Sequence, residues 1–147
     1  MISIKKFTFN PVQENTFVLF DETNECAIID AGCYFDYERE ELDRFITGKQ
    51  LKPVRLINTH CHFDHIMGIT HCRIKYKIPF EIHPDEAILI EQAAEHGDLF
   101  GIPVETIDAP DAYFQEGDQL KFGNSYLQVI AAPGHSPGGV VFYNPEQ

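Results

Sequence analysis

One short segment, THCHFDHIMG (59–68), constrains the fold of this chain more than any other. It carries three histidines and one aspartate between positions 60 and 65, and it directly follows the apolar run VRLIN (54–58). The apolar run indicates a buried strand, so the histidines lie where that strand leaves a sheet. A solvent-exposed loop gives no reason for imidazole to be concentrated in this way. We therefore expect a fold that gathers these side chains around a common ligand.

The spacing within the segment favours two adjacent metal positions over one. Residues two apart in extended backbone point to the same side, so His60 and His62 aim their rings together. Asp64 and His65 fall in the first turn of a predicted helix and cannot face the same direction as each other. We assign His60 and His62 to a first metal, and Asp64 and His65 to a second. These donors suit zinc, and they suit iron or manganese as well.

A second motif, APGHSPGG (132–139), supplies a further ligand. It places His135 in a turn of glycines and prolines between two predicted strands, at a sheet edge where a cleft can form. Three imidazoles and one open position are typical of a catalytic zinc site rather than a structural one. His60, His62 and His135 are therefore the predicted ligands of the first metal.

The pattern of the whole chain predicts one layered α/β domain over residues 1–147, with helices packed on sheets. Apolar and β-branched runs predict strands at 2–9, 15–20, 25–30, 54–58, 79–83, 118–123, 125–132 and 139–144. Helical periodicity and terminal residues predict helices at 36–49, 64–76 and 84–97.

Composition narrows the range of partners. The formal net charge of −12 argues against nucleic acid and against an anionic membrane surface, since both need clustered Lys and Arg. No apolar run is long enough to span a bilayer, and no signal peptide is recognisable. Four cysteines without paired spacing are read as reduced thiols, so we expect a cytoplasmic protein. The expected partner is a small-molecule substrate, and the oligomeric state stays open.

These motifs together resemble those of the metallo-β-lactamase-fold hydrolases. HCHFDH (60–65) is similar to the family pattern H-x-H-x-D-H, and GHSPGG (134–139) to its later G-H-[ST]-P-G turn. IIDAG (28–32) resembles a strand-ending D-x-G, and FNPVQENTFVLFDE (9–22) resembles the opening hairpin of the glyoxalase II-like branch. The resemblance implies an αββα sandwich, a four-layer α+β arrangement, with Asp30 just outside the metal ligands.

The resemblance also implies an activity, namely hydrolysis by a metal-activated hydroxide with two zinc ions in the full-length protein. Asp64 would bind one metal and help to orient the nucleophile. The glyoxalase II-like branch implies a thioester substrate such as a hydroxyacyl-glutathione. Two alternatives stay open. One is an iron-dependent oxidoreductase of the persulfide dioxygenase type on the same scaffold, and the other is a catalytically inactive metal-binding or partner-binding module.

The chain departs from the family pattern at its C-terminal end. Family members continue beyond the G-H-[ST]-P-G turn and there supply a bridging aspartate and a last histidine, whereas this sequence stops at Gln147. We therefore expect a C-terminally truncated chain with an incomplete second half, an incomplete second metal site and impaired activity.

The remaining histidines and cysteines are expected to have structural roles. His71, His83 and His96 match no ligand position and are predicted to lie at the surface or to cap helices. Cys61 lies between two ligands, but the alternation of the backbone points it away from the metal, so we expect a small buried residue. The other three cysteines are predicted to pack in the core.

Overall fold

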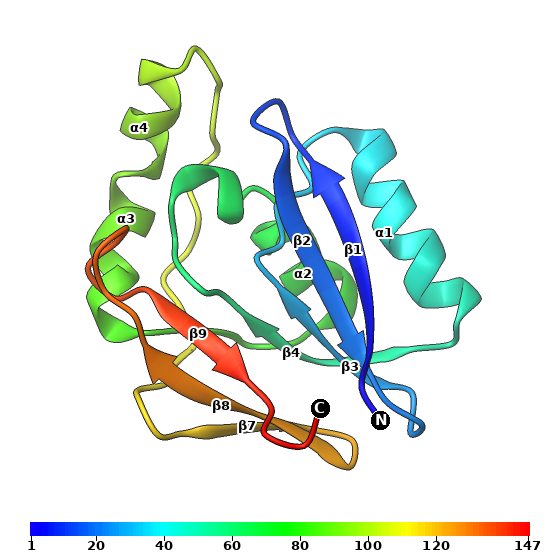
Figure 1. The fold of residues 1–147 in the computed structure, drawn as a ribbon. Helices are drawn as coiled ribbons and strands as arrows, with labels where there is room; N and C mark the ends of the chain where they lie inside the picture. The colour runs from blue at the N-terminus through cyan, green and yellow to red at the C-terminus, as the bar shows by residue number, and fades with distance from the viewer.

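Two β-sheets pack face to face in the computed structural model, which describes residues 1–147 (Figure 1). The first sheet has six strands in sequence order, antiparallel from β1 to β3 and parallel from β3 to β6. These strands are β1 (Ser3–Phe9), β2 (Glu14–Phe20), β3 (Glu25–Ile29), β4 (Lys52–Ile57), β5 (Phe80–Ile82) and β6 (Ala112–Tyr113). The second sheet is antiparallel and contains β7 (Gln119–Phe122), β8 (Ser125–Ala131) and β9 (Val140–Tyr143).

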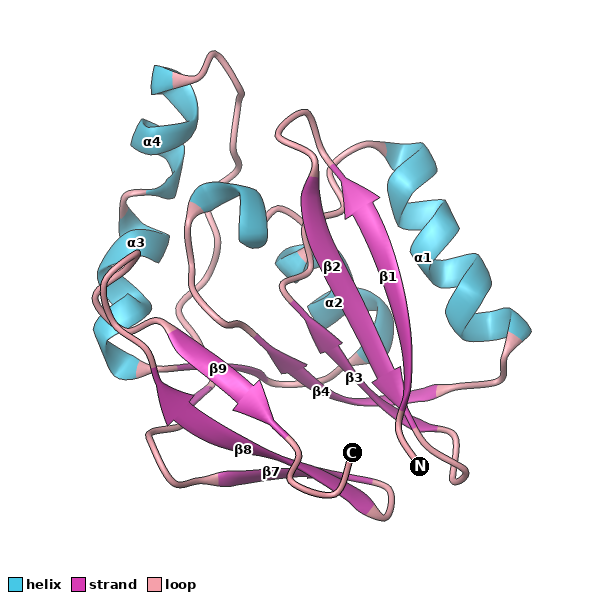
Figure 2. Cartoon of the chain, viewed as in Figure 1, coloured by secondary structure: helices cyan, strands magenta, loops and turns pink.

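Helices cover the face of the first sheet that points away from the second (Figure 2). They are α1 (Asp36–Gly48), α2 (Ile69–Tyr76), α3 (Ala87–Glu91) and α4 (Ala93–Leu99), with 3₁₀ turns η1 (Phe63–His65) and η2 (Pro84–Glu86). The longest, α1, has 13 residues, and none of the helices could cross a membrane.

Strand alternation explains why the molecule forms layers. In β3, Cys26 and Ile28 pack with the helices, whereas Ala27 and Ile29 pack with the second sheet, because successive side chains point to opposite faces. A strand that is apolar on both faces has to be covered on both faces. The outer face of the second sheet carries no helix, and Val141 and Tyr143 are about half exposed there. The mixed α/β architecture, with helices on one face of the first sheet and the second sheet on the other, confirms the expected α/β fold class.

The predicted helix 64–76 is wrong in its first turn. The structure has the single turn η1 there, and α2 begins only at Ile69. The reason is that other groups occupy the carbonyls that an α-helix would use. The Asn10 side chain donates to the Asp64 carbonyl at 2.9 Å, and the Asn58 side chain donates to the His65 carbonyl at 2.7 Å. The backbone N–H of Gly68 donates to the carbonyl of Ala31 instead of continuing the helix.

The predicted helix 84–97 is divided into η2, α3 and α4, and it continues to Leu99. Gly97 was predicted to end it but lies inside α4, where a Cβ atom would come within 2.5 Å of the Val104 side chain. The chain turns back at Gly101, which has a φ of 70°. Strand β6 was not predicted, since its two residues become a strand only by pairing with β5.

Candidate metal centre

The candidate site lies where the parallel strands β4 and β5 end, the edge at which α/β sheets commonly bind ligands. The segment after β4 carries His60 and His62, and the turn before β9 carries His135. The backbone N–H of Val140 donates to the carbonyl of Thr59 at 2.9 Å, which fixes that turn against the β4 segment. The second sheet thereby brings a residue from the far end of the sequence into the site.

The three histidines converge on one point. Nδ1 of His62 lies 3.1 Å from Nε2 of His135, and one ring nitrogen from each of the three residues lies within 4.8 Å of the others. Two nitrogens bound to one tetrahedral zinc at ~2.0–2.1 Å would be ~3.3 Å apart, so this spacing fits a shared metal ion.

The protonation of His60 also suits a metal ligand. Burial, together with the neighbouring His65, lowers the pKa of His60 to about 4, so the ring is neutral at pH 7. Thr59 Oγ1 donates its only proton to Asp30 and lies 2.9 Å from Nδ1 of His60. The hydroxyl can therefore only accept from that nitrogen, which leaves the lone pair of Nε2 free to bind a metal. Burial and the nearby His135 lower the pKa of His62 in the same direction.

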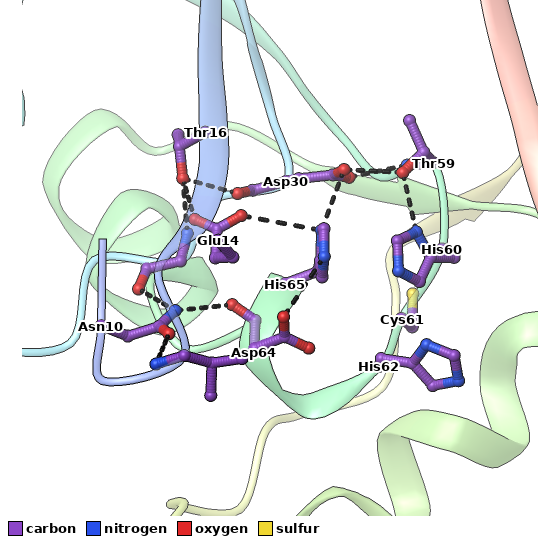
Figure 3. A network of polar contacts seen from close by, with 12 residues as sticks. Asn10, Glu14, Thr16, Asp30, Thr59, His60, Cys61, His62, Asp64 and His65 are labelled. Carbon is purple, nitrogen blue, oxygen red and sulfur yellow. Dashed lines mark hydrogen bonds and ion pairs between the residues drawn. The ribbon is translucent and has the colours of Figure 1, made fainter. Parts of the chain in front are cut away.

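Asp30 holds the side chains of Thr59 and His65 in place (Figure 3). One carboxylate oxygen accepts from the N–H of Thr59 at 2.7 Å, and the other lies 3.1 Å from Nδ1 of His65. Asp30, His60 and His65 lie close enough to form a second candidate metal group. Because Thr59 and His65 already engage both Asp30 oxygens, Asp30 suits an orienting role better than a ligand role. Its φ of 55° is rare for a residue other than glycine and marks backbone strain at the site.

His65 presents its other nitrogen to Asp64. Its Nε2 lies 3.4 Å from Oδ2 of Asp64, the pair predicted to serve a second metal. Burial by itself would lower the pKa of His65, but the hydrogen bond and the charge of Asp30 outweigh it and raise that pKa. The structure therefore brings Asp64 and His65 together next to the three-histidine group.

Glu14 is a site residue that the sequence reasoning missed. Its side chain is fully buried at the start of β2, with Oε2 3.6 Å from Nδ1 of His65. Burial raises the pKa of Glu14 to about 9, with Asp30 and Asp64 adding to the shift. Glu14 and the buried Thr16 are two positions apart in β2, so strand alternation would have predicted that Glu14 faces the same side as Thr16 and points inward.

A cleft of about 370 Å³ opens over the site. Its lining includes the five predicted ligands and an apolar wall, which consists of Val12, Phe63, Leu99 and Phe100. His96 also lines the cleft, so this partly exposed histidine lies at the surface next to the predicted ligands, a position that the sequence reasoning did not assign to it. The periodicity of α4 could not reveal this, because the sequence does not fix which face of a short helix meets the metal loop.

The other expectations for single residues agree with the structure. The ring of His83 caps η2 by accepting from the N–H of Asp85, and His71 lies 3.0 Å from the Asp43 carboxylate. Cys61 is completely buried, and the other three cysteines lie in the core.

Comparisons with known proteins place the chain in a family. Its sequence matches the profile of the Metallo-beta-lactamase superfamily over residues 9–147, and the chain belongs to that superfamily. It is 31% identical to the "Probable metallo-hydrolase YqgX" of Bacillus subtilis, covering 95% of this chain and 64% of the relative. It is 33% identical to the hydroxyacylglutathione hydrolase GloC of Haemophilus influenzae, covering 92% and 63%. The chain thus spans somewhat less than two thirds of the length of these curated relatives.

Solved structures agree with this assignment. The crystal structure of the BLEG-1 B3 metallo-beta-lactamase superposes with a TM-score of 0.86 at 32% identity, covering 98% of this chain and 68% of that one. A protein crystallised in a di-iron-bound form superposes with a TM-score of 0.81 at 32% identity, covering 97% and 67%. The expected membership of the metallo-β-lactamase fold is therefore confirmed.

Proposed function

We propose that the intact protein is a metal-dependent hydrolase centred on His60, His62 and His135. The observation that carries this proposal is the 3.1 Å approach of Nδ1 of His62 to Nε2 of His135, two residues that line a cleft. A metal held by these nitrogens would lower the pKa of a bound water towards ~7 and polarise a substrate carbonyl.

The chain's own residues orient and prepare this centre. Asp30 fixes the main chain of Thr59 and the ring of His65, and Thr59 fixes the tautomer of His60. The carboxylate of Asp64, which is 17% exposed and lines the cleft, can accept a proton from the attacking water and help to orient it. With His65 it also offers the donors of a second metal position, for zinc, iron or manganese.

For the substrate we propose a thioester such as a hydroxyacyl-glutathione. The support is the 33% identity to a hydroxyacylglutathione hydrolase, together with an apolar wall that could receive the acyl part of the substrate. We place this activity in the cytoplasm, on a small molecule rather than on nucleic acid or a membrane.

Metal analysis and an activity panel on the full-length protein test the proposal. We expect zinc at up to two ions per chain and hydrolysis of hydroxyacyl thioesters faster than hydrolysis of β-lactams. A protein that binds metal but turns over no ester, thioester or β-lactam would instead be the inactive metal-binding module.

A second candidate is an iron-dependent oxidoreductase of the persulfide dioxygenase type. Two observations favour it: the 32% identical protein that was crystallised with two irons, and 29% identity to the mitochondrial persulfide dioxygenase of mouse. Oxygen consumption with a persulfide by the iron-loaded protein, without thioester hydrolysis, would select this candidate.

A further inference from the structure

Glu86 is a buried carboxylate that touches both ligand-bearing segments. It ends η2, and only 1% of its surface is exposed. Its Oε1 accepts a hydrogen bond from the backbone N–H of Cys61 at 2.7 Å, and its Oε2 accepts one from the backbone N–H of Gly138 at 2.8 Å. Cys61 lies between two of the proposed ligands, and Gly138 lies in the turn that carries the third.

The hydrogen-bond partners of the Glu86 carboxylate are these two N–H groups, and it has no cation as a partner. No Lys, Arg or His nitrogen lies within ion-pair distance of its carboxylate. Hydrogen bonds to an ionised acceptor are roughly twice as strong as neutral ones, and both oxygens are engaged here. Glu86 therefore connects the β4 segment to the turn before β9.

The packing at Gly138 supports the same link independently of the hydrogen bonds. A Cβ atom at this position would lie 2.7 Å from Nδ1 of His83 and 3.1 Å from Cγ of Glu86. The turn that contains Gly138 is therefore in direct contact with η2. A side chain at Gly138 would move this turn away from the Glu86 carboxylate.

We propose that Glu86 is a positioning residue, whose carboxylate sets the distance between the His60–His62 segment and His135 and so assembles the metal site before the metal binds. This inference rests on the proposed three-histidine site. Glu86 acts only through the main chain of the ligand segments and does not bind the metal. Losing such an outer partner typically lowers metal affinity by ~10–100-fold.

The substitution Glu86→Gln in the full-length protein tests this role. Glutamine keeps one acceptor oxygen but turns an NH₂ group towards the other backbone N–H, so one of the two links is lost. We expect zinc affinity, measured by competition with a chromophoric chelator, to fall by ~10–100-fold. The matched control is Glu81→Gln, a buried glutamate on β5 that pairs with Arg55 at 2.7 Å and should leave zinc affinity unchanged.

Amide exchange in the metal-free protein gives a readout that does not depend on activity. The N–H groups of Cys61 and Gly138 should be protected in the wild type, and at least one of them should exchange faster in Glu86→Gln. If Glu86→Gln does not fold, Gly138→Ala takes its place, and it should also weaken zinc binding by crowding the turn.

The outcomes separate this inference from the proposed function. A wild-type protein that binds no zinc overturns the proposed function. A wild type that binds zinc, with Glu86→Gln or its replacement Gly138→Ala matching it in affinity and in exchange, overturns the role of Glu86 alone.

Discussion

Nδ1 of His62 and Nε2 of His135 lie 3.1 Å apart although the two residues are 73 positions apart in the chain. One residue follows a strand of the first sheet, and the other precedes a strand of the second. The packing of the two sheets therefore brings the candidate ligands together. Replacing a ligand on either sheet should abolish metal binding and leave the fold largely unchanged.

Removing His135 tests this relationship directly. We expect His135→Ala to lower zinc affinity by more than the ~10–100-fold typical of an outer hydrogen-bond partner, because a ligand itself is lost. The measurement is chelator competition on the full-length protein. His71→Ala, which removes a histidine bound to Asp43 outside the cleft, should keep wild-type affinity. Equal losses in the two variants would contradict the assignment of His135.

Asp21 should make stability depend on pH in the acid range. It is 3% exposed and accepts hydrogen bonds from Thr23 and from Asn124 and Ser125 of the β7–β8 turn. Burial alone would raise the pKa of Asp21, but these hydrogen bonds outweigh it and lower the pKa below 3.8. The resulting stabilisation is fully present above the unfolded-state pKa and is lost as the pH falls through the folded-state pKa.

We therefore expect Asp21→Asn to lower the free energy of unfolding at pH 7 by about 1–3 kcal/mol. The gap to the wild type should narrow as the pH is lowered below about 4, since the wild type then loses the same interaction. Urea unfolding of the metal-free proteins, followed by circular dichroism from pH 3 to pH 7, measures both effects. A gap that is independent of pH would show that the charge of Asp21 contributes nothing.

Glu14 should tolerate an amide but not truncation. The Thr16 hydroxyl contacts both Oε1 of Glu14 and the Asp30 carbonyl while accepting from the N–H of Gly32. The Thr16 hydroxyl has only one proton, which it can donate either to Glu14 or to the Asp30 carbonyl. Both contacts are hydrogen bonds only when Glu14 is protonated and donates to the hydroxyl oxygen. Glutamine supplies such a donor at every pH.

We expect Glu14→Gln to unfold at the same or a higher urea concentration than the wild type at pH 7. Glu14→Ala should lose roughly 2–4 kcal/mol, because it leaves a cavity and unpaired polar groups. Equilibrium unfolding of the metal-free proteins makes the comparison. A large loss in Glu14→Gln would mean that the carboxylate form is the one the fold requires.

The apolar wall of the cleft should influence which substrates are used. Phe100 is 68% exposed, and its ring centroid lies 5.3 Å from that of Phe63 beside the metal ligands. We expect Phe100→Ser to raise KM for thioesters with apolar acyl groups by about tenfold with little change in kcat, since it removes binding that is equal in the ground and transition states. Ile4→Ser, at an exposed apolar position on β1, is the control. An unchanged KM in Phe100→Ser would exclude the wall from substrate binding.

The sequence predicted the sheets better than the helices, and the reason is physical. Strands such as β3 are buried on both faces, so their continuous apolar runs are visible in the sequence. The turn after His62 has a sequence typical of a helix, but its backbone carbonyls accept hydrogen bonds from the side chains of Asn10 and Asn58. These two residues come from other parts of the chain. Local periodicity carries no information about such competition.

The sequence by itself determined the chemistry of the site. The spacing of His60, His62, Asp64 and His65 and the glycine-rich turn at His135 are local patterns, and they were sufficient to indicate the family and the candidate ligands. The tertiary structure alone decided which groups surround those ligands. Glu14, Glu86 and His96 reach the site from separate elements, and only long-range packing sets whether such side chains face a site, the core or solvent.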